Sequence, residues 1–128
     1  MSKENIEILN KINNAFAANN VEGFLENCSE SVAWTMVGER TVNGKDAIRG
    51  FMSEMAGSEP PVFGVDRIIA DGESVVCYGD MSMKDGEGHT SEWSYCDIYH
   101  FANGKVAEMS SFVIKKKGSD NSTDTAAA

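Results

Sequence analysis

The stretch that decides the fold is residues 90–115, TSEWSYCDIYHFANGKVAEMSSFVIK. Two segments rich in β-forming residues, Thr90 to Ala102 and Lys105 to Lys115, flank Asn103-Gly104, which is the strongest hairpin signal in the sequence. A turn this short cannot hold the crossover that a parallel pair needs, so the two strands must be antiparallel. The sequence therefore predicts a long antiparallel hairpin toward the C-terminal end.

Two more β segments precede this hairpin and extend it into a meander. We expect them at Val62 to Ala70 and at Ser74 to Met83, because β-forming apolar residues are bounded there by turn residues. The connections are Asp71-Gly72-Glu73 and the glycine-containing run from Asp85 to Gly88. Both are short, which again favours antiparallel neighbours.

The N-terminal half changes to helical spacing. Apolar residues recur every three or four positions from Lys3 to Ala18 and from Lys45 to Ala56, which predicts two amphipathic helices. Asn19-Asn20 favours a break followed by a short helix through Cys28, because Asn both ends helices and caps new ones. The apolar run from Val32 to Val37 is typical of a strand that is covered on both faces.

Taken together, these segments predict an α+β fold in which three N-terminal helices pack on a curved antiparallel β-sheet. We expect residues 1–116 to form a single domain, since the chain has the usual length of one domain and shows no internal repeat. Residues 117–128 contain nothing apolar beyond alanine and are expected to be a disordered tail.

Charge and composition exclude several classes of function. The 128 residues include 20 acidic and 11 basic side chains, giving a net charge of −9 that disfavours nucleic acid and anionic membrane surfaces as partners. The sequence has no apolar run long enough to span a bilayer and no signal-peptide core at its start, so we expect a cytoplasmic protein. The cysteines are odd in number and widely spaced, which favours reduced core thiols over disulfides or a metal site.

Two stretches carry a family resemblance, VAWTMVGERTVNGKDAIRGFM at residues 32–52 and WSYCDIYHFANGKVAEM at residues 93–109. At these residues the chain resembles the NTF2-like superfamily, specifically its SnoaL-like and ketosteroid-isomerase-like members. The resemblance implies an NTF2-like (cystatin-like) cone with an apolar pocket between the sheet and the helices. It also implies a small apolar ligand, no cofactor, and a homodimer formed through the outer face of the sheet.

Strand alternation singles out one carboxylate. In residues 93–101, Trp93, Tyr95, Asp97, Tyr99 and Phe101 share one face, so Asp97 lies within a row of aromatic side chains. If this row faces a pocket, burial would raise the Asp97 pKa and let the residue act as a general acid/base or as a neutral hydrogen-bond donor. If the row faces solvent or a dimer partner, Asp97 merely pairs with a neighbour. Both alternatives remain open at this level.

The resemblance also places Asp97 where ketosteroid isomerases keep their oxyanion-hole Asp, a role in which a carboxylic acid stays protonated. Two other parts of that enzyme's machinery are missing here. The general base on the first strand would fall within residues 34–37, which have no ionisable group. The helix-one tyrosine is replaced by Phe16 or a neighbouring Ala. Steroid isomerisation by that mechanism is therefore not expected.

We accordingly predict catalysis, if there is any, by Asp97 assisted by Tyr95 and Tyr99. The expected ligand-binding residues are aromatic, Met and neutral polar side chains on the strands and helices that would line the pocket: Phe16, Trp34, Met36, Phe51, Met55, Tyr78, Trp93, Met109, Ser111 and Val113. No metal site is expected, because His89 and His100 lack further ligands at suitable spacing.

Three functions are consistent with this pattern. The first is a SnoaL-like pocket protein, an isomerase, cyclase or hydrolase that acts by acid/base chemistry on an apolar ring-containing or polyketide-like molecule. The second is a non-catalytic binding or protein-interaction module of the same fold, which the incomplete catalytic set favours. The third is a stress or regulatory protein of the same fold with no pocket chemistry.

Overall fold

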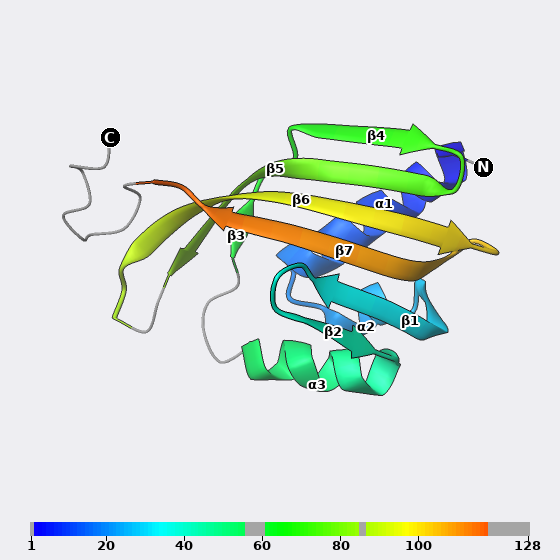
Figure 1. Cartoon of the computed structure of the whole chain (residues 1–128), viewed down its shortest axis with the longest axis horizontal. Coiled ribbons are helices and arrows are strands. Elements are labelled where there is room, and N and C mark those ends of the chain that lie inside the picture. The colour runs from blue at the N-terminus through cyan, green and yellow to red at the C-terminus, as the bar shows by residue number, and fades with distance from the viewer. Residues whose placement is uncertain (1, 56–60, 85–86, 118–128) are drawn as a thin grey trace.

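The computed structural model describes residues 2–55, 61–84 and 87–117. Its three helices lie on one side of a single curved sheet, with α1 crossing behind the long strands and α3 beside the short edge strand β2 (Figure 1). This is the α+β cone with three helices that the sequence predicts. The expected tail at 118–128 lies outside the described residues.

The helices follow the apolar spacing of the N-terminal half. They are α1 (Ser2–Ala17), α2 (Val21–Leu25) and α3 (Lys45–Met55). Leu9 and Ile12 of α1 and Ile48 of α3 are fully buried, as an amphipathic stripe requires. Asn19 takes the left-handed φ of 57° after α1, and Asn20 caps α2 by accepting a hydrogen bond from the Gly23 amide at 3.0 Å.

The strands are β1 (Cys28–Met36), β2 (Arg40–Asn43), β3 (Val62–Phe63), β4 (Arg67–Asp71), β5 (Ser74–Lys84), β6 (Thr90–Ala102) and β7 (Lys105–Lys115). They form one sheet in the order β2-β1-β7-β6-β5-β3, and β4 also pairs with β5. The β6–β7 hairpin has the predicted bounds, and Asn103 and Gly104 both take positive φ, as a two-residue turn of this kind requires. One pairing, that of β1 with β7, is parallel, so the sheet is mixed and not wholly antiparallel as expected.

Two predicted boundaries are wrong. The short second helix ends at Leu25 rather than Cys28, because Cys28 already pairs with Val106 of β7 and so belongs to β1. The segment from 62 to 70 is not one strand, since it breaks into β3 and β4. At the break the chain passes over Gly79 of β5 so closely that a Cβ on Gly79 would come within 2.1 Å of the Gly64 carbonyl oxygen.

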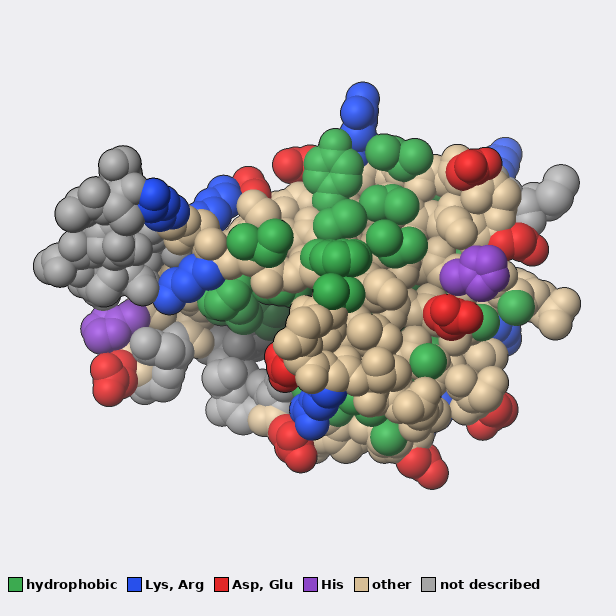
Figure 2. All heavy atoms as spheres, viewed as in Figure 1, with side chains coloured by type: hydrophobic (Ala, Val, Ile, Leu, Met, Phe, Trp, Pro, Cys, Tyr) green, Lys and Arg blue, Asp and Glu red, His purple; other side chains and the backbone are tan. Residues whose placement is uncertain are grey.

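The core lies between the helices and the inner, concave face of the sheet. Its largest fully buried side chains include Tyr99 and Phe101 of β6 and Phe24 of α2. The outer face carries no covering layer among the described residues, and hydrophobic side chains gather over it in the view of Figure 2. They include Ile98, Phe112 and Ile114, which are 37, 38 and 66% exposed. The inner face of the sheet is therefore packed against the helices, whereas the outer face exposes hydrophobic side chains.

Candidate functional site

The aromatic row of β6 faces the helices. Tyr95, Tyr99 and Phe101 are buried, whereas the intervening Ile98 and His100 are exposed on the outer face. This partition follows from the two-residue period of a strand. The alternative in which the row faces solvent is therefore excluded, and Asp97, between Tyr95 and Tyr99, points into the interior of the cone.

Asp97 sits at the centre of the sheet, between two other polar side chains. Its cross-strand partners are Cys77 on β5 and Ser111 on β7, so all three side chains share the inner face. Burial raises the pKa of Asp97 from its ordinary value of 3.8 to about 6, and a hydrogen bond with Ser111 opposes part of that rise. Desolvation of the charged form is thus the dominant cause.

The two tyrosines beside Asp97 differ in their hydrogen bonding. The Tyr95 hydroxyl donates to the Gly64 carbonyl oxygen at 2.8 Å and lies 3.9 Å from Cys77 Sγ. The Tyr99 hydroxyl is buried and has no hydrogen-bond partner among the described residues. Burial raises the pKa of both phenols, so both are neutral donors at physiological pH.

Four aromatic rings from three helices and one strand form a wall of the interior. Trp34 of β1 lies at the centre, with ring centroids 6.3 Å from Phe16, 5.7 Å from Phe24 and 5.7 Å from Phe51. The guanidinium of Arg40 lies over the Phe51 ring, 4.5 Å from its centroid. Phe16, Trp34 and Phe51 are among the residues predicted from the sequence, whereas Phe24 is not. The available signal was the helical spacing of Phe24, three residues after the apolar Val21 in the short second helix.

Trp34 also makes a polar contact inside this wall. Its indole Nε1 donates to the Ser111 hydroxyl at 2.8 Å, and both residues are buried. The contact is possible because β1 and β7 are neighbours in the parallel register that places Trp34 opposite Met109 and Met36 opposite Ser111. The aromatic wall and Asp97 are thereby joined through one hydroxyl.

The remaining predicted residues are only partly brought together. Met36, Met109 and Val113 share the inner face with Ser111, with Met109 buried and Val113 42% exposed near the end of β7. Trp93 lies further out on the Asp97 row, where its indole donates to Ser91 at 2.8 Å. The side chain of Met55 lies outside the described residues.

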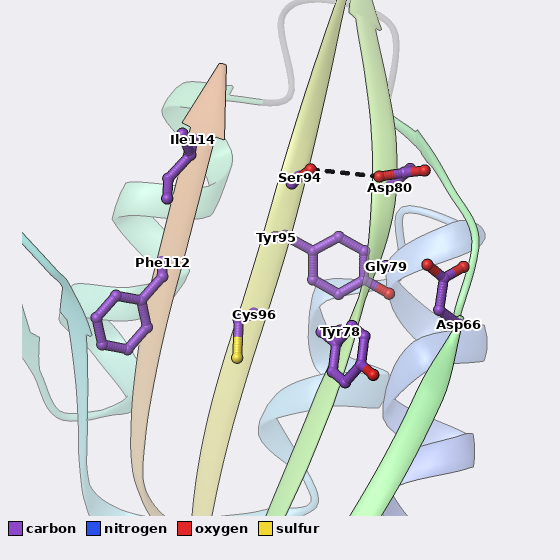
Figure 3. Close-up of a pocket in the computed structure, with 9 residues that line it drawn as sticks. All are labelled: Asp66, Tyr78, Gly79, Asp80, Ser94, Tyr95, Cys96, Phe112 and Ile114. Atoms are coloured by element: carbon purple, nitrogen blue, oxygen red, sulfur yellow. Dashed lines mark hydrogen bonds between the residues drawn. The ribbon is translucent and has the colours of Figure 1, made fainter. Parts of the chain in front are cut away.

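Tyr78 does not join this group. On β5 the inward positions are Val75 and Cys77, which are buried, so Tyr78 points to the opposite face. There it lines an open depression of about 340 Å³, together with Asp66, Asp80, Cys96, Phe112 and other residues (Figure 3). Asp80 accepts a hydrogen bond from Ser94 at 3.3 Å and pairs with Lys116 at 3.2 Å. Tyr78 therefore lies on the opposite face of the sheet from Asp97, and its role in ligand binding stays a prediction.

Within residues 2–55, 61–84 and 87–117, the structure gathers no group of three His, Cys, Asp or Glu side chains that could hold a metal ion. Among the same residues, no helix combines the length and the apolar character that crossing a membrane requires.

Comparison with known proteins agrees with this architecture. An NTF2-like protein of unknown function from Burkholderia pseudomallei K96243 superposes with a TM-score of 0.79 at 20% identity, covering 84% of this chain and 88% of that one. An LEH-like epoxide hydrolase of M. tuberculosis gives a TM-score of 0.77 at 16% identity, with 88% of this chain and 84% of that one covered. A candidate SnoaL-like polyketide cyclase from Jannaschia sp. CCS1 gives 0.80 at 16% identity, with coverage of 88% and 86%.

These likenesses show the fold alone, and a search of curated proteins gave no match. A family model described as the SnoaL-like domain matches residues 9–109, which is most of the chain. The match includes the aromatic wall and the Asp97 row as well as the predicted hairpin turn. The chain shares the fold of NTF2-like proteins, and it belongs to the SnoaL-like domain family.

Proposed function

We propose that this protein is a cofactor-independent enzyme of the SnoaL-like type that performs acid/base chemistry on a small, apolar, ring-containing or polyketide-like molecule. The observation that carries the proposal is the position of Asp97, which is turned inward among aromatic side chains with a pKa raised to about 6. A carboxyl group in that state exchanges protons readily near neutral pH. At pH 7 about a tenth of the molecules hold the proton, so Asp97 can serve as a base or as an acid.

The neighbouring hydroxyls have separable roles in this proposal. Tyr99 has a buried phenol with no partner among the described residues, so a ligand oxygen would satisfy it. Tyr95 already donates to the Gly64 carbonyl and would mainly shape the site. A ligand oxygen that accepts from Tyr99 and exchanges a proton with Asp97 would be stabilised where its negative charge develops.

The expected substrate class follows from the walls of the site. Phe16, Trp34 and Phe51 pack against one another there, and in this proposal they would supply the flat apolar contacts that suit rings. The family membership and the neighbours described as a candidate polyketide cyclase and an epoxide hydrolase support cyclisation or hydrolysis as the reaction class. Residues 34–37 supply no second base, which argues against a proton shuttle of the ketosteroid-isomerase kind.

The experiment has two stages. Native mass spectrometry of protein purified without denaturation would identify a retained ligand, and a panel of anthraquinones, naphthoquinones and aliphatic epoxides would be screened by thermal shift and for turnover. The active compound is then assayed from pH 5 to 8 with the wild type, Asp97→Asn and the exposed control Asp71→Asn. We expect a limb in the rate profile near pH 6 that disappears with Asp97→Asn only. Full activity of Asp97→Asn would refute the proposal.

A homodimer formed through the outer face of the sheet belongs to the same proposal. Ile98, Phe112 and Ile114 are exposed there in neighbouring positions of β6 and β7, and Figure 2 shows the hydrophobic surface to which they contribute. A second copy meeting this face would cover it symmetrically. Size-exclusion chromatography with light scattering should show a dimer for the wild type and for the edge control Val62→Glu, and a monomer for Ile98→Glu.

The alternative function is an interaction module whose working surface is this outer face. It is favoured if the wild type is monomeric and binds a macromolecule in a way that Ile98→Glu abolishes and Asp97→Asn does not. Either function is proposed to operate in a reducing cytoplasm, because Cys28, Cys77 and Cys96 are all unpaired thiols.

A further inference from the structure

A short chain of hydrogen-bonding groups links three strands across the inner face of the sheet. Trp34 on β1 donates from Nε1 to Ser111 Oγ on β7 at 2.8 Å. Ser111 in turn is the cross-strand neighbour of Asp97 on β6, on the same inner face and within reach of its carboxyl group, and it opposes the rise of the Asp97 pKa. Trp34 and Ser111 are both buried, at 8 and 6% exposure. Their burial therefore excludes bulk water from most of this row of hydrogen-bonding groups.

The number of donors on each group sets the direction of these hydrogen bonds. An indole N–H can only donate, whereas a serine hydroxyl has one proton and two acceptor lone pairs. Because Trp34 occupies a lone pair of Ser111, the Ser111 proton is left to donate elsewhere. Asp97 lies directly opposite on the facing strand, and Ser111 lowers its pKa, so its carboxylate is the acceptor that we assign to this proton. Each bond polarises the next, so the two bonds strengthen each other when Asp97 is charged.

We propose that Trp34 and Ser111 form a hydrogen-bond relay that directs the Ser111 proton to Asp97, which makes Ser111 a positioning residue that favours the carboxylate form of Asp97. The inference rests on the proposed function, in which Asp97 is the working acid/base group. When Asp97 takes up a proton, its own O–H competes to be the donor and the Ser111 proton must turn away. The bond from Trp34 is then weaker, so the indole senses the protonation state of Asp97.

The other groups that face Asp97 are neutral near pH 6. They are Cys77 from β5 and Tyr95 and Tyr99 from β6, whose pKa values are all raised by burial. From α1, the side chain of Asn13 reaches Cys77 Sγ at 3.7 Å and carries no charge. Among the described residues no charged side chain contributes to the shift of the Asp97 pKa. Ser111 is thus the group that lowers the Asp97 pKa against the rise caused by burial.

The second tryptophan of the protein provides an internal control for a test. It has two tryptophans, and each indole N–H donates to a serine hydroxyl at 2.8 Å: Trp34 to Ser111, and Trp93 to Ser91. We expect two resolved indole signals in a ¹H–¹⁵N spectrum of ¹⁵N-labelled protein, and Trp34→Phe would assign them. Only the Trp34 signal should follow Asp97.

The measurement is a titration from pH 4 to 8 of the two indole signals and of the ¹³C carboxyl signal of Asp97. We expect the Trp34 indole and the Asp97 carboxyl to titrate with the same midpoint, near pH 6. In Asp97→Asn the Trp34 response should vanish, while any response of Trp93 stays the same. Ser111→Ala should raise the Asp97 midpoint by about one pH unit, a tenfold change in proton affinity. Ser111→Thr, which keeps the hydroxyl, should restore most of the shift.

Trp34→Phe should raise the midpoint in the same direction by a smaller amount, because it removes only the outer bond of the relay. An unchanged or lowered Asp97 midpoint in Ser111→Ala would overturn the proposal, as would a Trp34 signal that does not respond to Asp97. None of these readouts needs a substrate. If the relay is found but Asp97→Asn keeps full activity, the proposed function fails while the relay stands.

Discussion

Replacing Asp97 by Asn should make the folded protein more stable at neutral pH. The carboxylate must be desolvated in the native state, where its pKa is about 6, whereas its ordinary value in an unfolded chain is 3.8. Between these values the native state holds more protons than the unfolded state, so stability falls as pH rises from about 4 to about 6. A pKa difference of about two, at about 1.4 kcal/mol per unit, makes this loss about 3 kcal/mol. Asn has nearly the same shape and never acquires the charge.

The assay is urea unfolding of the wild type, Asp97→Asn and the exposed control Asp71→Asn at several pH values from 4 to 8. Protein concentration is held fixed, because association would shift the apparent stability. The wild type and Asp97→Asn should have similar unfolding free energies at pH 4 and should separate to about 3 kcal/mol above pH 7. The Asp71→Asn profile should run parallel to that of the wild type. Parallel profiles for the wild type and Asp97→Asn would refute the burial argument.

Three further outcomes are expected. Gly79→Ala should lower the unfolding free energy by more than about 2 kcal/mol, because the new Cβ would meet the Gly64 carbonyl oxygen at 2.1 Å. Gly50→Ala in α3 meets nothing within 4 Å and should raise the unfolding free energy by about 1 kcal/mol. Chemical denaturation measures both changes. Tyr99→Phe should leave thermal stability unchanged or raise it by up to about 1 kcal/mol, because it removes a buried hydroxyl without a described partner, and it should weaken binding of whichever screened compound stabilises the wild type. Phe24→Ala, made in a Trp93→Phe background so that Trp34 is the one remaining indole, should cost about 3–5 kcal/mol and shift the emission spectrum, since the Phe24 and Trp34 rings lie 5.7 Å apart; an unaffected spectrum would count against the shared aromatic wall.

The β6–β7 hairpin shows how far local sequence reasoning reaches. Asn103-Gly104 specifies its own turn through the positive φ of both residues, so the strand bounds and the antiparallel pairing are predictable from residues close in sequence. The same holds for the sharing of a face by Tyr95, Asp97 and Tyr99, because the period of a strand is two whatever its surroundings.

The break at Gly64 and the length of β1 could not be predicted in this way. β3 and β4 separate because the chain must pass over Gly79, a residue on another strand. Cys28 joins β1 because Val106 is there to pair with it, although a helix through Cys28 suits the local sequence. In both cases a contact between residues far apart in sequence overrides the local preference.

For the candidate site, the sequence by itself determined that Asp97 shares one face of its strand with Tyr95 and Tyr99, and that Cys96, Ile98 and His100 share the other. It left open which set faces inward, because alternation fixes the relative orientation of neighbours and not the side on which the helices pack. Tertiary structure decided that, and it also decided the contact between Trp34 and Ser111. That contact depends on the parallel pairing of β1 with β7, a long-range pairing that the helices make possible and that no local periodicity encodes.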